Sequence, residues 1–380
     1  MAQIDQHTSA ALNIIRLPLA FLIVAGHANT LLFPLKSHGD LICYDYSLIK
    51  YPIHLLSQVL FCSAVPLFFV ISGFLFFVGL NHYGLDEYKD KMARRAKTLL
   101  VPYLMWNLIY LIRPLVGNIL KDKGYSMWFF IESLWIDPGQ TDRIALMDMA
   151  TPADPPLWFI RDLMVCMVLS PGIWYVARHR YLCSIVFIAL FVPWFMNMPI
   201  QYPFPGISIP SMLFFLSGAI LAVRHVNVAP WLDGTKHKWV FAVITTYIFL
   251  AIVDLFQVDY MITFNGENID ATILHTPIVA NGIALIGCIV FMIIAYRVAC
   301  SNMTGISEMG GAFSVFATHW MLLSVSRMLI EKICPVEISQ LEGFVLFLML
   351  VAIGFLGGLI INYVLIRNCY LAKLFLGGRT

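Results

Sequence analysis

The sequence predicts an all-α integral membrane protein that crosses the bilayer about ten times, with both termini in the cytoplasm. Three observations lead to this fold class. Of the 380 residues, 60% are hydrophobic and only 12% are charged, whereas about a quarter of the residues of soluble domains are charged. Apolar stretches long enough to span the hydrocarbon recur along the whole chain. Basic residues concentrate in alternate connecting segments.

The predicted spans are apolar runs of about twenty residues. They lie near residues 11–33, 55–80, 96–119, 157–177, 181–197, 207–223, 239–256, 272–296, 310–330 and 343–366. The run at 181–197 is the shortest, and only the proline-rich turn PIQYPFPG separates it from the next. Nine or eleven spans are therefore open alternatives.

The lysines and arginines test this count, because cytoplasmic segments carry the excess of positive charge. With the N-terminus inside, the inner segments hold Lys89, Lys91, Arg94, Arg95, Lys97, Arg178, Arg180, Arg224, Lys236, Lys238, Arg297, Arg367, Lys373 and Arg379. The outer loops hold only Lys36, Lys50, Lys121, Lys123, Arg143 and Lys332. This asymmetry favours an even number of spans with both termini cytoplasmic.

We expect a single transmembrane domain over residues 1–380 and no separate soluble domain, because no polar segment is long enough to form one. No cleavable signal peptide is predicted, since the first arginine, Arg16, already lies inside the first apolar run. A net charge of +2 provides no basic domain for nucleic acid. The eight cysteines are scattered without metal-type spacing, so we expect packing roles and no metal site.

Two features between the spans bear on the fold. The longest polar interruption, at 120–156, begins with SMWFFIESLW, which suits a short helix in the outer interface. The segments PLFFVISGFLF (66–76) and MLFFLSGAILA (212–222) resemble one another, and both lie on spans predicted to run inward. A parallel repeat would explain this likeness. We favour chance, because small residues are common at apolar helix contacts.

Arg16 and His27 lie within one apolar stretch, IIRLPLAFLIVAGH. Eleven helical residues make about three turns, so both side chains project from one face, roughly 16 Å apart along the axis. A guanidinium inside the membrane needs a partner, a bound anion or water, and by default it marks a functional site. The simpler alternative is that Arg16 extends to the headgroups and His27 bonds a carbonyl group.

Other polar residues also fall inside the predicted spans, and together they imply a polar cavity. They are Ser72, Asn107, Arg161, Asp162, His319 and Arg327. At the inner end of the third span, Arg94, Arg95 and Lys97 form a basic set that suits a phosphate-bearing ligand. A plain topogenic anchor is the alternative.

Four motifs resemble the membrane-bound acyltransferase 3 family of bacterial proteins. They are the Arg16 and His27 pair, the run PLFFVISGFLF, the start of the third span RRAKTLLVPYLMWN, and LWFIRDLMV in the fourth span. Weaker matches are SIPSMLFFLSGAIL and FATHW, which contains His319. The resemblance implies about ten membrane helices and transfer of an acyl group, usually acetyl, to a hydroxyl of a carbohydrate.

The resemblance also assigns residues. The essential arginine and histidine of the family fall on Arg16 and His27, its basic motif on Arg94, Arg95 and Lys97, and its fourth-span tryptophan and arginine on Trp158 and Arg161. Some members carry an arginine where this chain has Lys97, a change that keeps charge but loses the planar fork. Other members carry a fused esterase-like domain, which we do not expect here.

The implied donor is cytosolic acetyl-CoA or another acyl-CoA, whose polyphosphate suits the set Arg94, Arg95 and Lys97. His27 is the candidate general base for the acceptor hydroxyl, and a transient acyl-imidazole on His27 is the alternative. Arg16 is expected to orient His27 or to bind the donor, because arginine is not deprotonated in proteins.

Four further residues have both structural and functional interpretations. Ser72 is the family's tempting nucleophile, but we expect its hydroxyl to bond a carbonyl one turn back in a close-packed helix contact. Trp158 and its neighbour Phe159 suit the aromatic belt, although Trp158 would also stack on a sugar. Arg161 and His319 either line the acceptor cavity or satisfy local bonds.

The function we predict is an O-acyltransferase of the bacterial inner membrane that uses acyl-CoA and a glycan or lipid-linked sugar, in contact with membrane lipids and without a permanent cofactor. The alternative is a transporter or glycolipid flippase, because ten spans with intramembrane charge also describe transporters. A receptor-like protein without catalysis is a third possibility, and the presence of both Arg16 and His27 argues against it.

Overall fold

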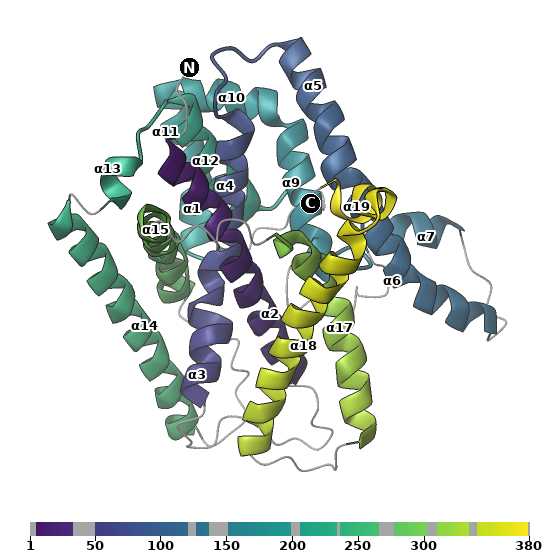
Figure 1. Cartoon of the computed structure of the whole chain (residues 1–380). Coiled ribbons are helices and arrows are strands. Elements are labelled where there is room, and N and C mark those ends of the chain that lie inside the picture. The colour runs from purple at the N-terminus through teal and green to yellow at the C-terminus, as the bar shows by residue number, and fades with distance from the viewer. Residues whose placement is uncertain are drawn as a thin grey trace.

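The computed structural model describes residues 5–32, 50–120, 127–136, 151–198, 206–233, 236–265, 277–301, 310–333 and 340–378. Every regular element in these ranges is helical, which confirms the all-α prediction for the described chain. Figure 1 shows the long helices side by side, with α14 at one edge and α6 with α7 at the other.

The N-terminal half begins with two helices that share one predicted span. Helix α1 (Gln6–Ile14) and helix α2 (Arg16–Leu32) are separated by a break at Ile15. Pro18 explains the position of this break, because it has no N–H to donate to the carbonyl of Ile14 and its ring crowds that carbonyl. Arg16 therefore starts α2, and His27 lies eleven residues further along the same helix.

The second predicted span begins earlier than expected and is not uniform. It comprises α3 (Lys50–His54), a π-helical turn η2 (Leu55–Val59), a 3-10 turn η3 (Phe61–Ser63) and α4 (Ala64–Phe77). The basic segment after it forms α5 (Leu85–Arg95), which continues through a second π-helical turn, η4 (Ala96–Leu100), into α6 (Val101–Leu120). The sequence SMWFFIESLW contains the predicted short helix, α7 (Met127–Ser133).

The fourth predicted span, 157–177, is not one helix. The short turn η6 (Pro155–Leu157) leads into α9 (Trp158–Val168), and α10 (Ser170–Arg178) follows at a bend of 66°. Pro171 and Gly172 stand at the start of α10, and this pair accounts for the bend, because proline removes a helical hydrogen bond and glycine adds backbone freedom.

The remaining described elements are α11 (Arg180–Phe195), α12 (Ile209–Val223), α13 (Ala229–Leu232), α14 (His237–Asn265), α15 (Pro277–Cys300), α17 (Ala312–Ile333), α18 (Gln340–Ile366) and α19 (Cys369–Leu376). Within the described chain, six helices are long and apolar enough to cross a membrane, or seven if the bent pair α9 and α10 is one span. Helices α11 and α12 are apolar but shorter. The count of ten spans and the cytoplasmic termini therefore stay predictions.

The two segments with similar sequences, in α4 and α12, pack against each other. The interpretation of their likeness as chance did not predict this contact. An ideal Cβ at Gly73 of α4 would collide with the carbonyl oxygen of Phe215 in α12, and one at Gly218 would collide with the carbonyl oxygen of Val70. The two contacts are equivalent, because Phe215 stands three residues before Gly218 and Val70 stands three residues before Gly73. This reciprocal contact gives the pair α4 and α12 a local two-fold character.

Helix α2 is surrounded by other helices, because it contacts α17, α18, α4 and η2. Two glycines of α18 permit the close approach: Gly354 packs against Val24, and Gly358 packs against Val315 of α17. The hydroxyl of Ser314 donates to the carbonyl of Gly358 at 3.0 Å, which fixes α17 against α18. The side chains of α2 therefore face protein and not only lipid.

Candidate active site

The structure brings together two histidines that are 292 positions apart in the chain. The ring centroids of His27 in α2 and His319 in α17 are 5.2 Å apart. Trp320 stands at 5.2 Å from His27 with its ring nearly perpendicular, and Phe61 of η3 lies at 6.0 Å. His27 is partly exposed and His319 is fully buried. We call His27 and His319 the histidine pair.

Hydrogen bonds define the tautomer of His319. Its Nδ1 lies 2.7 Å from the carbonyl oxygen of Phe316 and 3.1 Å from that of Val315. Because a carbonyl only accepts, Nδ1 carries the proton and Nε2 is left as an acceptor in the neutral ring. This buried Nε2 has no hydrogen-bond partner within the described chain. The histidine pair therefore contains an unused acceptor, as a proton-handling site requires.

Gly26 determines how closely the second span approaches His27. An ideal Cβ at Gly26 would lie 2.5 Å from Cδ2 of Phe61, so the ring occupies the space that a side chain would fill. The π-helical turn η2 precedes Phe61, and the 3-10 turn η3 begins with it. Single π-helical turns are frequent at functional sites. The sequence Ala25-Gly26-His27 thus allows an aromatic wall beside the imidazole.

A basic cluster forms where α5 meets the end of α4. Lys91 donates to the carbonyl oxygen of Phe76 at 2.5 Å and lies 5.0 Å from the centre of its ring. The guanidinium of Arg95 lies 6.0 Å from the same ring. We define the basic cluster as Lys91, Arg94 and Arg95.

The electrostatics of the cluster confirm its crowding. Burial, together with the charges of Arg95 and Arg94, lowers the pKa of Lys91 to about 8. Burial also lowers the pKa of Arg95, with added repulsion from Arg94 and Arg16. Arg16 therefore lies near the cluster, although it belongs to another helix. In the described part of the chain, these three cations and Arg16 form no ion pair with a carboxylate, so this region keeps an excess of positive charge.

The predicted basic residues differ in exposure. Arg95 and Arg16 are partly buried, whereas Arg94 and Lys97 are exposed. Lys91, which sequence reasoning treated only as topological charge, lies nearer the interior than Lys97 does. Its spacing of four residues from Arg95 was the available signal, because residues i and i+4 share a helix face.

The three other predicted site residues, Arg161, Trp158 and Ser72, have separate surroundings. Arg161 is buried, pairs with Asp162 at 3.0 Å and donates to the carbonyl of Trp135 at 2.9 Å. Trp158 is partly buried against Phe69 at 6.3 Å.

Its neighbour Phe159 is buried between Phe69 and Phe316, so the prediction of an aromatic belt is wrong for Phe159. Ser72 is partly exposed and makes no hydrogen bond within the described chain, so the expected bond to a carbonyl one turn back is absent there. Its neighbour Gly73 alone makes the close helix contact.

Among the described residues, sequence reasoning missed three buried ionisable groups. His54 and Asp254 are joined at 2.7 Å between α3 and α14, and both are buried. The third group is Asp154, just before α9, which was assigned to a loop. The signal for Asp254 was a lone acid inside an apolar run, whereas the burial of Asp154 depends on tertiary packing.

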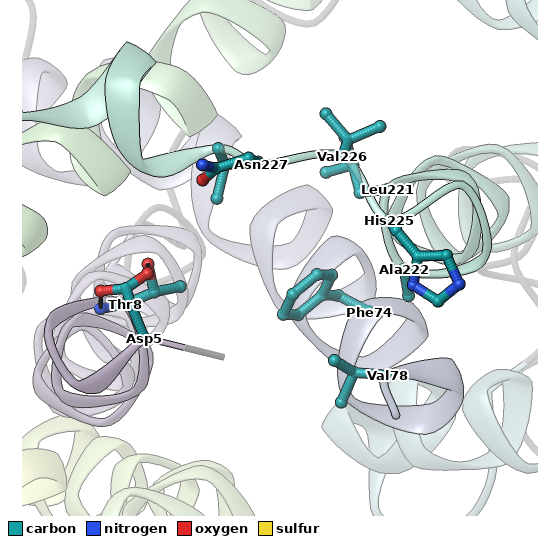
Figure 2. A pocket seen from close by; sticks show the side chains of 10 residues that line it. Asp5, Thr8, Phe74, Val78, Leu221, Ala222, His225, Val226 and Asn227 are labelled. Atoms are coloured by element: carbon teal, nitrogen blue, oxygen red, sulfur yellow. Dashed lines mark hydrogen bonds between the residues drawn. The ribbon is translucent and has the colours of Figure 1, made fainter. Parts of the chain in front are cut away.

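A cavity of about 310 Å³ opens between α1, the end of α4 and the end of α12 (Figure 2). It is lined by Asp5, Thr8, Phe74, Val78, Leu221, Ala222, His225, Val226, Asn227 and Val228. The carboxylate of Asp5 already accepts the N–H of Thr8, which caps α1. None of the predicted catalytic or donor-binding residues lines this cavity.

Comparison with known proteins agrees with these features. A family model described as "Acyltransferase domain" matches residues 9–367. The succinoglycan biosynthesis protein ExoH of Rhizobium meliloti (strain 1021) is 28% identical over 229 residues. That alignment covers 59% of this chain and 56% of ExoH, so the chain matches little more than half the length of its relative. No solved structure matches. The match to the family model includes the histidine pair and the basic cluster, and the chain belongs to the acyltransferase 3 family.

Proposed function

We propose that this protein is a membrane O-acyltransferase that moves an acyl group, in the simplest case acetyl, from acyl-CoA to a hydroxyl of a cell-envelope glycan or glycolipid. The observation that carries the proposal is the arrangement along α2. Arg16, at its start, faces a basic cluster, and His27, about 16 Å further along, faces a second histidine. Such a distance suits a long, thin donor with phosphates at one end and a thioester at the other.

The basic cluster is the proposed site for the phosphates of the donor. Arginine offers a planar fork to phosphate oxygens, and lysine offers a point charge. Arg95 and Lys91 are held over the ring of Phe76 and are partly buried, so they lose less conformational freedom on binding than exposed side chains do. Arg16 then lies where the pantetheine arm would enter the bundle.

Transfer takes place at the histidine pair in this proposal. His27 takes the proton of the acceptor hydroxyl as its oxygen attacks the thioester carbonyl. The new carbon–oxygen bond forms, the carbon–sulfur bond breaks, and the proton passes from the imidazolium to the departing thiolate. In this proposal His27 donates a hydrogen bond to the Nε2 of His319, and this bond sets the tautomer of His27. An acyl-imidazole on His27 is the alternative route to the same products.

The glycan acceptor follows from the relative ExoH, whose name assigns it to succinoglycan biosynthesis. We extend this to a carbohydrate acceptor here, without a choice among polysaccharide, lipopolysaccharide and lipid-linked sugar. The long apolar helices favour a multi-pass protein of the inner membrane, with the donor entering from the cytoplasm.

The test is direct. Purified protein is assayed for equilibrium binding of acetyl-CoA and for release of free CoA thiol when membranes that contain envelope glycans are added. We expect saturable binding and thiol release that depends on the membranes. Folded protein that binds no acetyl-CoA and releases no thiol would contradict the proposal and favour the transporter alternative.

A further inference from the structure

Asp154 is a buried carboxyl group that the mechanism above does not use. It exposes 2% of its surface and stands immediately before η6, in the position that caps a helix. Its side chain nevertheless makes no capping hydrogen bond. Its Oδ1 atom is buried without a hydrogen-bond partner in the part of the chain that the structure describes. Such an atom carries an unrecovered desolvation penalty.

The local sequence explains why the carboxyl does not cap. A capping aspartate accepts from the second or third N–H of the helix. Here Pro155 and Pro156 occupy the first two positions and have no N–H, and the N–H of Leu157 bonds to the backbone carbonyl of Asp154 at 3.0 Å. Asp5 is the contrasting case, because its carboxylate accepts the N–H of Thr8 at 2.9 Å.

The backbone around Asp154 is held by other bonds. The side-chain oxygen of Asn107 accepts the N–H of Asp154 at 3.0 Å, and Asn107 itself donates to the carbonyl of Tyr103 at 2.9 Å. The N–H of Ala153 donates to the carbonyl of Ser133 at 2.8 Å. Helices α6 and α7 therefore fix the backbone at Asp154 without any contribution from its carboxyl group.

The charge of Asp154 is also not matched by a cation. Among the described residues, no ion pair includes Asp154. Burial raises the pKa of its carboxyl well above the usual value. A structural carboxylate in such a place would be paired or bonded, and the described residues provide Asp154 with neither a cation nor a bond to Oδ1.

Asp154 lies close to the helix that carries the second histidine. The turn η6 packs against α17. One turn further, Phe159 contacts Phe316 at 5.5 Å between ring centroids, and Phe316 lies 6.1 Å from His319. The unpartnered carboxyl and the histidine pair thus belong to neighbouring segments of one buried region.

We propose that Asp154 binds the acceptor, through a hydrogen bond between its carboxyl group and a hydroxyl of the sugar. A hydroxyl both donates and accepts, so it satisfies the carboxyl in either protonation state. A polyanionic donor is disfavoured here, because no described cation forms an ion pair with Asp154. This inference rests on the proposed function, since it names a residue for the acceptor of that reaction.

The test compares Asp154→Leu and Asp154→Asn with a matched control, Asp5→Ala, which removes a capping aspartate. Each protein is purified for Tm and acetyl-CoA binding, and each is assayed in glycan-bearing membranes for labelled acetyl incorporated into glycan at limiting glycan concentration. We expect both Asp154 variants to keep the wild-type Tm or exceed it and to bind acetyl-CoA normally. Transfer should fall about 10- to 100-fold in Asp154→Leu and less in Asp154→Asn, whose amide can still bond a hydroxyl. Asp5→Ala lowers the Tm and leaves transfer per folded molecule unchanged.

Two results would overturn the assignment. Wild-type transfer per folded molecule in the folded Asp154 variants would exclude an acceptor role, whatever their Tm, and loss of acetyl-CoA binding would place Asp154 in the donor site. Failure of the proposed function is distinguishable, because the wild type would then bind no acetyl-CoA at all. Asp154→Asn has nearly the same shape as aspartate, so it provides a folded variant even if Asp154→Leu does not fold.

Discussion

The contact between Gly26 and Phe61 offers the sharpest structural prediction. In Gly26→Ala, the new Cβ would lie 2.5 Å from Cδ2 of Phe61, whereas carbon atoms in contact keep about 3.5–4.0 Å. The ring, or α2 itself, must therefore move by about 1 Å or more. Overpacking of this kind costs ~1–3 kcal/mol of stability, which lowers the Tm moderately.

The effect on catalysis should exceed the effect on stability. Phe61 lies 6.0 Å from the ring of His27, so the displacement reaches the imidazole directly. A misplacement of about 1 Å can cost on the order of 10²-fold in rate. We expect the initial rate of acetyl transfer from acetyl-CoA to glycan to fall by that order, while the affinity for acetyl-CoA changes little.

Two comparisons isolate the cause. Adding Phe61→Leu to Gly26→Ala removes the colliding ring edge and should restore part of the rate, which a double-mutant cycle measures as a coupling between the two sites. Gly310→Ala is the control, because an ideal Cβ there meets no atom within 4 Å. A folded Gly26→Ala protein with the wild-type rate would refute this reasoning, and so would a double variant with no recovery.

Three further predictions concern the charged residues. Because the pKa of Lys91 is lowered to about 8, its charge is present below that pH and is lost as the pH rises through it. The affinity for acetyl-CoA should therefore fall between about pH 7 and 9. Lys91→Arg should flatten this dependence in equilibrium binding, and an identical profile in the variant would exclude Lys91 from donor binding. Arg95→Gln should weaken acetyl-CoA binding more than Arg94→Gln does, because Arg95 is partly buried and Arg94 is exposed; equal losses would indicate a diffuse anchor. Arg161→Gln should lower the Tm strongly in thermal unfolding, because it leaves the buried Asp162 without its cation, with a cost of ~3–5 kcal/mol; an unchanged Tm would show that the pair contributes little.

The parts of the fold that depend on local sequence could be predicted. Apolar runs located six spans of the described chain, and the spacing of Arg16 and His27 placed both in one helix. The bend after Val168 was missed, although Pro171 and Gly172 stand there, because hydropathy alone does not register geometry. The early start of the second span at Lys50 was missed for a similar reason, since polar residues such as His54 interrupt the run.

The candidate site could be predicted only in part, because it is assembled from distant segments. A single sequence gives no indication that His319 approaches His27, or that Lys91 approaches Arg16 through Arg95. Asp154 was treated as loop because of its prolines, and those same prolines leave its carboxyl without a partner. Long-range packing determines each of these contacts, and composition and periodicity do not report it.

The most direct measurement determines acetyl-CoA affinity and acetyl transfer to glycan on the same preparations of the wild type, His27→Ala and Arg95→Gln. We predict that His27→Ala binds acetyl-CoA with nearly wild-type affinity and transfers no label, whereas Arg95→Gln binds weakly and transfers label only at high donor concentration. This split would assign donor binding to one end of α2 and chemistry to the other. Transfer by folded His27→Ala at the wild-type rate would contradict the assignment of chemistry to the histidine pair.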